Sequence, residues 1–272
     1  MSYDGYVGRS ETRHDDVSAR LIAGMAATLG VDIPDVLPPL WHWMLFQDWV
    51  QPDQIGPDGH PRRGGFLPPV RHLPRRMWAG GRLRLLGDLR PGEAATRTST
   101  ILAVNEKQGG SGALVFVTVR HVVAGASGPV IEEEQDLVYR GAEGAAVKPA
   151  PPVADPRPAD EGIRGEVLPD PVLLFRYSAL TGNGHRIHYD MDYVREVEGY
   201  PGLIVHGPLQ ATWLAGLLRG RRLARFSFRG QRPAFHGHTL RLEARPDGAG
   251  YRMRTLDETG AVCMVAEAEV AA

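Results

Sequence analysis

The chain has 272 residues, enough for one large domain or two ordinary ones, each with its own core. Hydrophobic residues make up 43% and charged residues 23%, a balance that excludes a disordered chain. A formal net charge of -1 gives no sign of a polyanionic partner, so we expect no nucleic-acid binding. The single cysteine, Cys263, excludes an internal disulfide. The first residues lack the apolar core of a signal peptide, and no later stretch is long enough to span a membrane. We therefore expect a cytoplasmic protein with no membrane contact.

The first half of the sequence predicts one helix, a long loop and then a strand meander. Residues 18–29 have the apolar spacing of an amphipathic helix, with Ser18 as its cap and Gly30 as its stop. Residues 34–74 are rich in Pro, Gly and Trp and predict a covering loop with short helical turns, of the kind that often lines a site. Four strands of an antiparallel sheet are predicted at 82–89, 94–104, 112–124 and 129–139.

The second half repeats this plan after an Ala/Pro-rich segment. Residues 141–165 predict an exposed linker, which divides the chain into units of 1–140 and 166–272. In the second unit, a helix at 208–220 precedes four strands, at 223–230, 238–246, 251–257 and 261–271. The dipeptides Arg90-Pro91 and Arg232-Pro233 follow the first strand of each meander, which indicates a degenerate internal duplication.

A helix followed by an antiparallel meander favours a hotdog fold, because a strongly twisted sheet curls around the apolar helix on its concave face. Two tandem copies predict an α+β double hotdog in which the two sheets pair edge to edge. That pairing leaves fewer open edge strands. Because sheet faces and edges remain unpaired, we also expect a homo-oligomer.

A crowded polar stretch, TGNGHRIHYD at 181–190, lies in the second unit. We expect the preceding residues 175–180 to form a strand or its end, and the glycines of the stretch to place its polar residues on a turn. His188 lies five residues after Asn183 and two before Asp190, so the three side chains could converge on one small volume. A neutral His188 there could hold and deprotonate a water molecule.

A helix N-terminus is predicted just downstream, where a short apolar strand ends at His206. Pro208 suits a first helical position, so the amide of Gly207 should belong to an exposed helix end. Such an end can stabilise a developing oxyanion. A water-activating histidine facing an oxyanion site is what hydration of an α,β-unsaturated thioester requires.

The stretches FRYSALTGNGHRIHYD and GYPGLIVHGPL resemble the MaoC-like (R)-specific enoyl-CoA hydratase and dehydratase family, in particular its mesaconyl-CoA hydratase-like double-hotdog branch. GRSETRHDD and the Trp-rich loop are similar to the N-terminal dehydratase-like domain of that branch. The resemblance implies a hydro-lyase acting on a 2-enoyl or 3-hydroxyacyl thioester of CoA or an acyl carrier protein, with a short, branched or dicarboxylic acyl group such as mesaconyl. It implies no metal and no cofactor beyond the CoA or phosphopantetheine of the substrate.

The family motif, Gly-Asp-x-Asn-Pro-x-His, is only partly kept. Gly182 and His188 match it, but Asn183 stands where the family has its catalytic aspartate, and an amide cannot accept a proton. The resemblance therefore implies that His188 is the base, that Asn183 orients the water, and that the Gly207 amide holds the thioester oxygen. Asp190 or His185 is left as a second proton carrier.

Four further residues of this region are expected to contact the substrate: His185, Arg186, Tyr189 and His206. Arg186 would meet a CoA phosphate. Because the motif occurs only in the second unit, we expect one active site per chain. The first unit would then be a degenerate hotdog that contributes to the acyl cavity, and its histidines before residue 140 would be dispensable for turnover.

Three other interpretations remain open at this stage. A hotdog thioesterase would use Asp190 to activate water, and a non-catalytic acyl-thioester-binding module would explain the missing aspartate. A metal site built from His185, His188 and Asp190 has suitable donors but a weak spacing signal.

Overall fold

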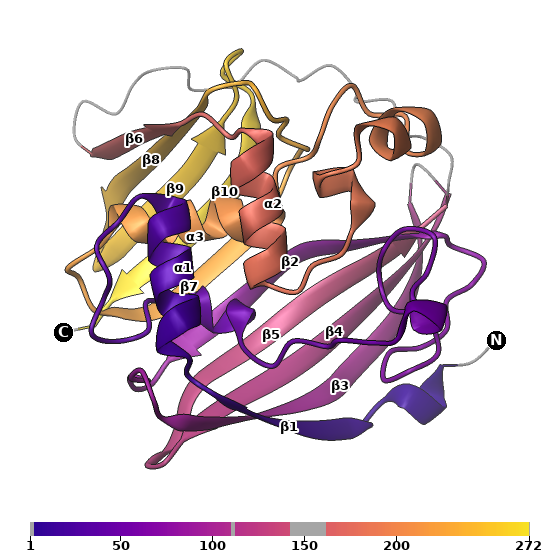
Figure 1. The fold of residues 1–272 in the computed structure, drawn as a ribbon, viewed down its shortest axis with the longest axis horizontal. Coiled ribbons are helices and arrows are strands. Elements are labelled where there is room, and N and C mark those ends of the chain that lie inside the picture. The colour runs from indigo at the N-terminus through magenta and orange to yellow at the C-terminus, as the bar shows by residue number, and fades with distance from the viewer. Residues whose placement is uncertain (1–2, 110–111, 142–161, 272) are drawn as a thin grey trace.

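The computed structural model describes residues 3–109, 112–141 and 162–271. Within these ranges ten strands form one antiparallel sheet in the order β1-β3-β4-β5-β2-β7-β10-β9-β8-β6 (Figure 1). The first half contributes β1 (Ser10–Asp16), β2 (Arg75–Leu85), β3 (Ala94–Gly109), β4 (Gly112–Gly125) and β5 (Gly128–Arg140). The second half contributes β6 (Ile163–Val167), β7 (Leu223–Gly230), β8 (Leu240–Asp247), β9 (Gly250–Leu256) and β10 (Val262–Val270). Read outward from the β2/β7 junction, the two halves have matching strand orders, which is the expected double hotdog.

The two half-sheets are joined where β2 pairs with β7. The antiparallel register runs from Gly80 opposite Arg229 to Arg84 opposite Arg225. A backbone ladder across this junction removes two open edges at once. The expected edge-to-edge pairing is therefore confirmed.

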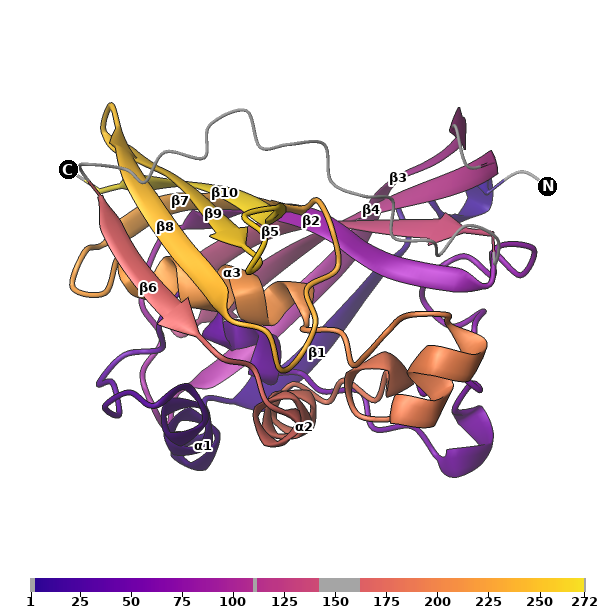
Figure 2. The same cartoon turned by 90° about the horizontal axis from the view of Figure 1, so that it is seen from above.

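Three α-helices lie on the inner, concave side of the sheet (Figure 2): α1 (Ala19–Leu29), α2 (Pro171–Leu180) and α3 (Gly207–Leu217). Helix α3 packs against all five strands of the second half, as the hotdog expectation requires. Helices α1 and α2 lie side by side, farther from the sheet (Figure 2). No helix in the described part of the chain is long and apolar enough to cross a membrane.

In the first half the sheet does not enclose a long helix as the second half encloses α3. Helix α1 packs against α2, and a Cβ on Gly24 would lie only 3.0 Å from Leu180 Cδ2, so the small residue permits this close approach. The short 3-10 helix η2 (Trp41–Met44) lies against the sheet instead. There the Trp43 indole Nε1–H donates to the buried Glu133 carboxylate on β5, at 3.0 Å.

Several local predictions were wrong or incomplete. Residues 175–180 are the end of α2, because the Asp170 side chain accepts from the Leu173 amide and caps a helix that begins at Pro171. Strand β6 starts at Ile163, inside the predicted linker 141–165, whose residues 142–161 lie outside the described residues. Strand β1 was missed, and the apolar stretch before His206 forms only an isolated bridge between Ile204 and Phe235.

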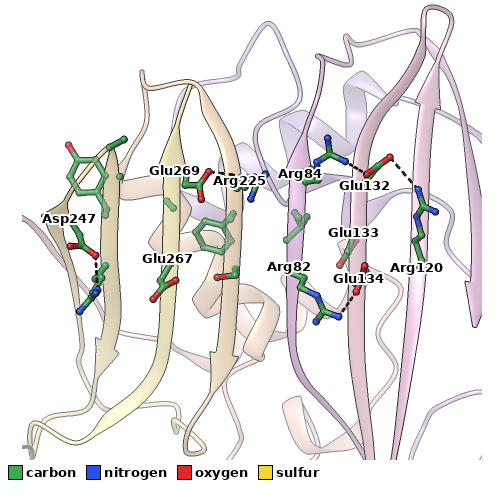
Figure 3. A pocket seen from close by; sticks show the side chains of 18 residues that line it. Arg82, Arg84, Arg120, Glu132, Glu133, Glu134, Arg225, Asp247, Glu267 and Glu269 are labelled. Atoms are coloured by element: carbon green, nitrogen blue, oxygen red, sulfur yellow. Dashed lines mark hydrogen bonds and ion pairs between the residues drawn. The ribbon is translucent and has the colours of Figure 1, made fainter. Parts of the chain in front are cut away.

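The outer face of the sheet carries a hollow of about 630 Å³ at the junction of the two halves (Figure 3). Its arginines are paired: Arg84 with Glu132 at 2.7 Å, Arg252 with Asp247 at 2.7 Å, and Arg82 with Glu134. These charges neutralise one another across neighbouring strands, which is a common way to solvate an exposed sheet face.

The junction makes a prediction about Gly80. A Cβ at this position would overlap the Phe228 carbonyl oxygen on β7, so Gly80→Ala must push the two halves apart. We expect the free energy of unfolding, measured by urea denaturation, to fall by about 1–3 kcal/mol, the range for strained or overpacked sites.

Gly216→Ala is the matched control, because a Cβ there meets nothing within 4 Å and the residue lies in α3. It should raise stability by about 0.5–1 kcal/mol through helix propensity. Equal stabilities for the two variants would contradict the close contact at the junction.

Candidate active site

Four histidines from both halves of the chain form a continuous row of rings. The centroid of His60 lies 4.3 Å from that of His185, His185 lies 5.6 Å from His188 in an edge-to-face contact, and His188 stacks on His206 at 3.6 Å. The sequence singled out the last three, His185 and His188 in the polar stretch 181–190 and His206 before the predicted helix. The row therefore joins the long loop of the first half to the motif of the second.

His188 is held as a neutral base. It ends the short 3-10 helix η4 (Arg186–His188), and its Nδ1 lies 2.7 Å from the Ile204 carbonyl oxygen. A carbonyl only accepts, so Nδ1 carries the hydrogen and Nε2 keeps the lone pair. Burial lowers the pKa of His188 to about 4, so the ring is unprotonated at neutral pH.

His206 lies behind His188 and is fully buried. Its Nε2 is 2.8 Å from the Ser178 hydroxyl on α2, and burial lowers its pKa well below the ordinary value. Its Nδ1 is a buried atom without a hydrogen-bond partner in the described part of the chain. In the structure the His206 ring stacks on the ring of His188, and its expected contact with substrate stays a prediction.

Gly207, next in the chain, is the first residue of α3, with Pro208 following it. Amides in the first turn of a helix have no partner within that helix, and the positive end of the helix dipole lies there. A Cβ on Gly207 would be in ordinary van der Waals contact with Met264 Cε at 3.8 Å, so the Met264 side chain lies beside this backbone. The expected helix end is confirmed.

Asn183 and His185 are tied together by the turn. The Asn183 side-chain oxygen accepts from the backbone amide of His185 at 3.0 Å. The backbone amide of Asn183 donates to the Ser178 carbonyl at 2.9 Å. Desolvation and the neighbouring rings of His60 and His188 lower the pKa of His185 to about 2. Asn183 therefore positions His185, and its water-orienting role stays a prediction.

Asp190, Arg186 and Tyr189 are engaged with the protein itself. The Asp190 carboxylate accepts from Arg186 Nη2 at 2.7 Å and from the Tyr193 amide at 3.0 Å, and these bonds keep its pKa low. Arg186 also lies over the Tyr193 ring, at 4.3 Å from its centroid, and the Tyr189 hydroxyl donates to the Gly184 carbonyl. Asp190 thus holds the backbone at the beginning of the short π-helix η5 (Tyr193–Val197), and its role as a proton carrier stays a prediction.

Sequence reasoning missed Asp58 and His60, which the first-half loop places against the motif. Asp58 Oδ2 lies 3.0 Å from His60 Nδ1, and the Asp58 carbonyl accepts from the Arg186 amide at 2.9 Å. A Cβ on Gly59 would overlap the Gly184 carbonyl oxygen, so this close approach requires glycine. The only signal in the sequence was Asp-Gly-His within a long loop, and nothing there showed which segment the loop contacts.

One group in this region could hold a metal ion: Asp58, His60 and His185 each place a donor atom within 4.8 Å of the others. This differs from the set His185, His188 and Asp190 considered from the sequence, because Asp190 pairs with Arg186. The same three residues also contact one another directly. The Asp58 carboxylate is hydrogen-bonded to the His60 ring, and the His185 ring lies against the His60 ring.

Comparison with known proteins gives consistent matches. The profile of the hydroxyacyl-thioester dehydratase type 2 family matches residues 40–236. The mesaconyl-C(4)-CoA hydratase of Chloroflexus aurantiacus is 45% identical over 273 residues, covering 97% of this chain and 96% of the relative.

Solved structures extend the match to the fold. A MaoC-like dehydratase from Phytophthora capsici superposes with a TM-score of 0.72 at 18% identity, covering 100% of this chain and 99% of that chain. Rv0216 of Mycobacterium tuberculosis, which has a double hotdog fold, superposes with a TM-score of 0.57 at 15% identity, covering 97% of this chain and 96% of that chain. At these identities the structures show the shared fold alone.

The buried rings predict a pH-dependent stability. Burial holds the pKa of His206 below its ordinary value of 6.5, so the unfolded chain binds a proton as the pH falls while the folded chain does not. The free energy of unfolding should therefore fall between pH 7.5 and pH 5, by about 2 kcal/mol for each such group.

In urea denaturation at both pH values, His206→Gln should lose about 2 kcal/mol less than wild type over this interval. Trp213→Phe, a change at a buried ring of α3 that does not titrate, should keep the wild-type loss over this interval. An unchanged pH dependence in His206→Gln would show that the ring is protonated in the folded protein.

Proposed function

Because the chain belongs to the hydroxyacyl-thioester dehydratase type 2 family, we propose that its histidine row is the active site of an enoyl-thioester hydratase. The enzyme is a hydro-lyase that reversibly adds water to a 2-enoyl-CoA and removes it from a 3-hydroxyacyl-CoA. The observation that carries this assignment is the neutral His188, with Nε2 free to accept a proton, beside the open helix end at Gly207.

In the hydration direction His188 activates the water. Nε2 takes a proton from water as the water oxygen bonds to the β-carbon of the enoyl group. The π electrons of the carbon–carbon double bond move to the thioester oxygen, which becomes an enolate. The Gly207 amide and the N-terminus of α3 stabilise that charge. The proton then reaches the α-carbon and the thioester carbonyl re-forms.

His60 is the second group that can carry the proton to the α-carbon. The ionised Asp58 accepts from Nδ1, so the lone pair of His60 lies on Nε2, on a ring that contacts His185. A carboxylate behind an imidazole stabilises the imidazolium that forms when the ring accepts a proton. The Asp58–His60 pair thus supplies a group that accepts and releases a proton, which the Asn183 amide cannot do and which the family aspartate does elsewhere.

This assignment revises the expectation that histidines before residue 140 are dispensable. That expectation assumed that the first half only shapes the acyl cavity, whereas the structure brings His60 to the row. It also weakens the thioesterase interpretation, which depended on Asp190, because that carboxylate pairs with Arg186.

The identity of the acyl group and of the thiol that carries it is a separate proposal. The 45% identical relative is named for mesaconyl-C(4)-CoA, and we propose a short, branched or dicarboxylic acyl-CoA for this chain as well. Use of a carrier-protein thioester, a homo-oligomeric state and a cytoplasmic location stay predictions.

The first test follows enoyl-thioester absorbance with crotonyl-CoA and mesaconyl-CoA while free thiol is measured in parallel. Wild type should remove the absorbance without releasing thiol, and His188→Ala should lower kcat/KM by about 10²–10⁴-fold, the usual value of general-base catalysis. Thiol release that persists in His188→Ala would instead indicate a thioesterase.

A second test separates His60 from His14, an exposed histidine of β1 in the same half. His60→Gln and Asp58→Asn should each lower kcat, by about 10²-fold or more for His60, with small changes in KM, and should shift the pH dependence of kcat. His14→Gln should match wild type. Equal kcat for all variants would restore the view that the first half takes no part in proton transfer. Loss of wild-type activity on treatment with a chelator would assign Asp58 and His60 to a metal site.

A further inference from the structure

Arg76 points to the inner side of the sheet because of a bulge in β2. Before the bulge, Arg76 pairs with Tyr139 and Trp78 pairs with Leu137, and both of these partners on β5 are buried. The register shifts between Trp78 and Gly80, so the extra residue changes which residues face inward.

The arginines beyond the bulge face the opposite way. Arg82 pairs with Glu134 and Arg84 with Glu132 on the outer face of the sheet (Figure 3). Trp78, two residues after Arg76, contacts the Trp43 ring of η2 at 4.8 Å on the inner face. Alternation along a strand therefore places Arg76 on the same inner side as Trp78.

The arginines near Arg76 are already occupied. Arg75 forms an ion pair with Glu198 at 3.0 Å, Arg63 donates to the carbonyls of Val70, Leu73 and Pro74, and Arg186 pairs with Asp190. Arg76 is partly buried, and across residues 3–109, 112–141 and 162–271 its guanidinium has neither an ion pair nor a hydrogen bond. A guanidinium that is partly desolvated without a counter-ion is unfavourable unless a ligand supplies one.

The charge of Arg76 acts on the histidine row. Burial is the main cause of the lowered pKa values of His60 and His185, and the charge of Arg76 lowers both further, while Asp58 raises both. Asp58 is bonded to His60, so it does not serve as the partner of Arg76. Arg76 is therefore an unpaired cation close to the proposed reacting groups.

We propose that Arg76 binds a free carboxylate at the far end of the acyl chain, so that the enzyme selects dicarboxylic over monocarboxylic enoyl thioesters. This inference rests on the proposed function, because it places the acyl chain beside His60 and His185. A guanidinium can hold a carboxylate through two parallel hydrogen bonds, which fixes both its position and its orientation. A site built to pair a polar group discriminates strongly against a substrate that lacks it.

The test compares fumaryl-CoA with crotonyl-CoA, which differ only in a terminal carboxylate or methyl group. Wild type should prefer fumaryl-CoA in kcat/KM, and Arg76→Gln should lower the ratio of the two values by about 100-fold or more, mainly through the KM for fumaryl-CoA. Arg84→Gln is the control, since it removes an arginine from the same strand on the outer face, and its ratio should equal that of wild type. Arg76→Lys, which keeps the charge and loses the paired hydrogen bonds, should recover part of the ratio.

A parallel binding measurement does not depend on turnover. Calorimetry with succinyl-CoA and butyryl-CoA, which again differ in one carboxylate, should show a preference for succinyl-CoA that Arg76→Gln abolishes. If folded wild type hydrates neither enoyl thioester, the proposed function fails, while the binding preference still decides the role of Arg76. If Arg76→Gln weakens both members of each pair equally, the inference is overturned, and Arg76 acts on the thioester or on the fold.

Discussion

The antiparallel pairing of β2 with β7 is the constraint on which the rest of the structure depends. It turns two curved half-sheets into one sheet with a continuous inner face, and both halves then build on that face. The loop between α1 and β2 crosses to the second half, where it contacts the residues that follow α2. The contact of Gly59 with Gly184 and the bond from the Arg186 amide to the Asp58 carbonyl then fix where the loop lies.

The proposed chemistry depends on the lowered pKa values of the histidine rings on that inner face. All four rings in the row have pKa values lowered mainly by desolvation, which keeps them neutral and able to accept a proton but makes them weaker bases. His60 differs from His188 in its orienting partner, since a carboxylate stabilises a protonated ring more strongly than a backbone carbonyl does. Two imidazoles with different orienting partners can divide the tasks of taking up and releasing a proton, which explains how the site can work with an asparagine in the motif.

The sequence was most informative where the signal is local. The alternation of the strand runs, the Ser18 cap and Gly30 stop of α1, and the helix end at Gly207 all depend on residues close in the chain, and each appears in the structure. The contribution of the first half to the site could not be found in this way. Asp58 and His60 reach His185 across more than 120 intervening residues, and no periodicity connects them. The apolar residues of 175–180 are compatible with a strand as well as a helix, and the Asp170-Pro171 start signal decides for the helix. Asp190 pairs with Arg186, four residues earlier, so the close spacing of Asp190 and His188 in the sequence does not bring their side chains together.

The bulge between Trp78 and Gly80 has a consequence for how such proteins diverge. One extra residue decides whether the arginines of β2 face solvent or face the histidine row, so the set of side chains offered to a substrate is tied to strand length as well as to residue identity. A deletion of a single codon here would exchange the inner and outer side chains on one side of the bulge together. Related chains that align without gaps in this strand should therefore retain the same polarity of acyl chain even when many residues differ, whereas a one-residue gap would mark a change of substrate.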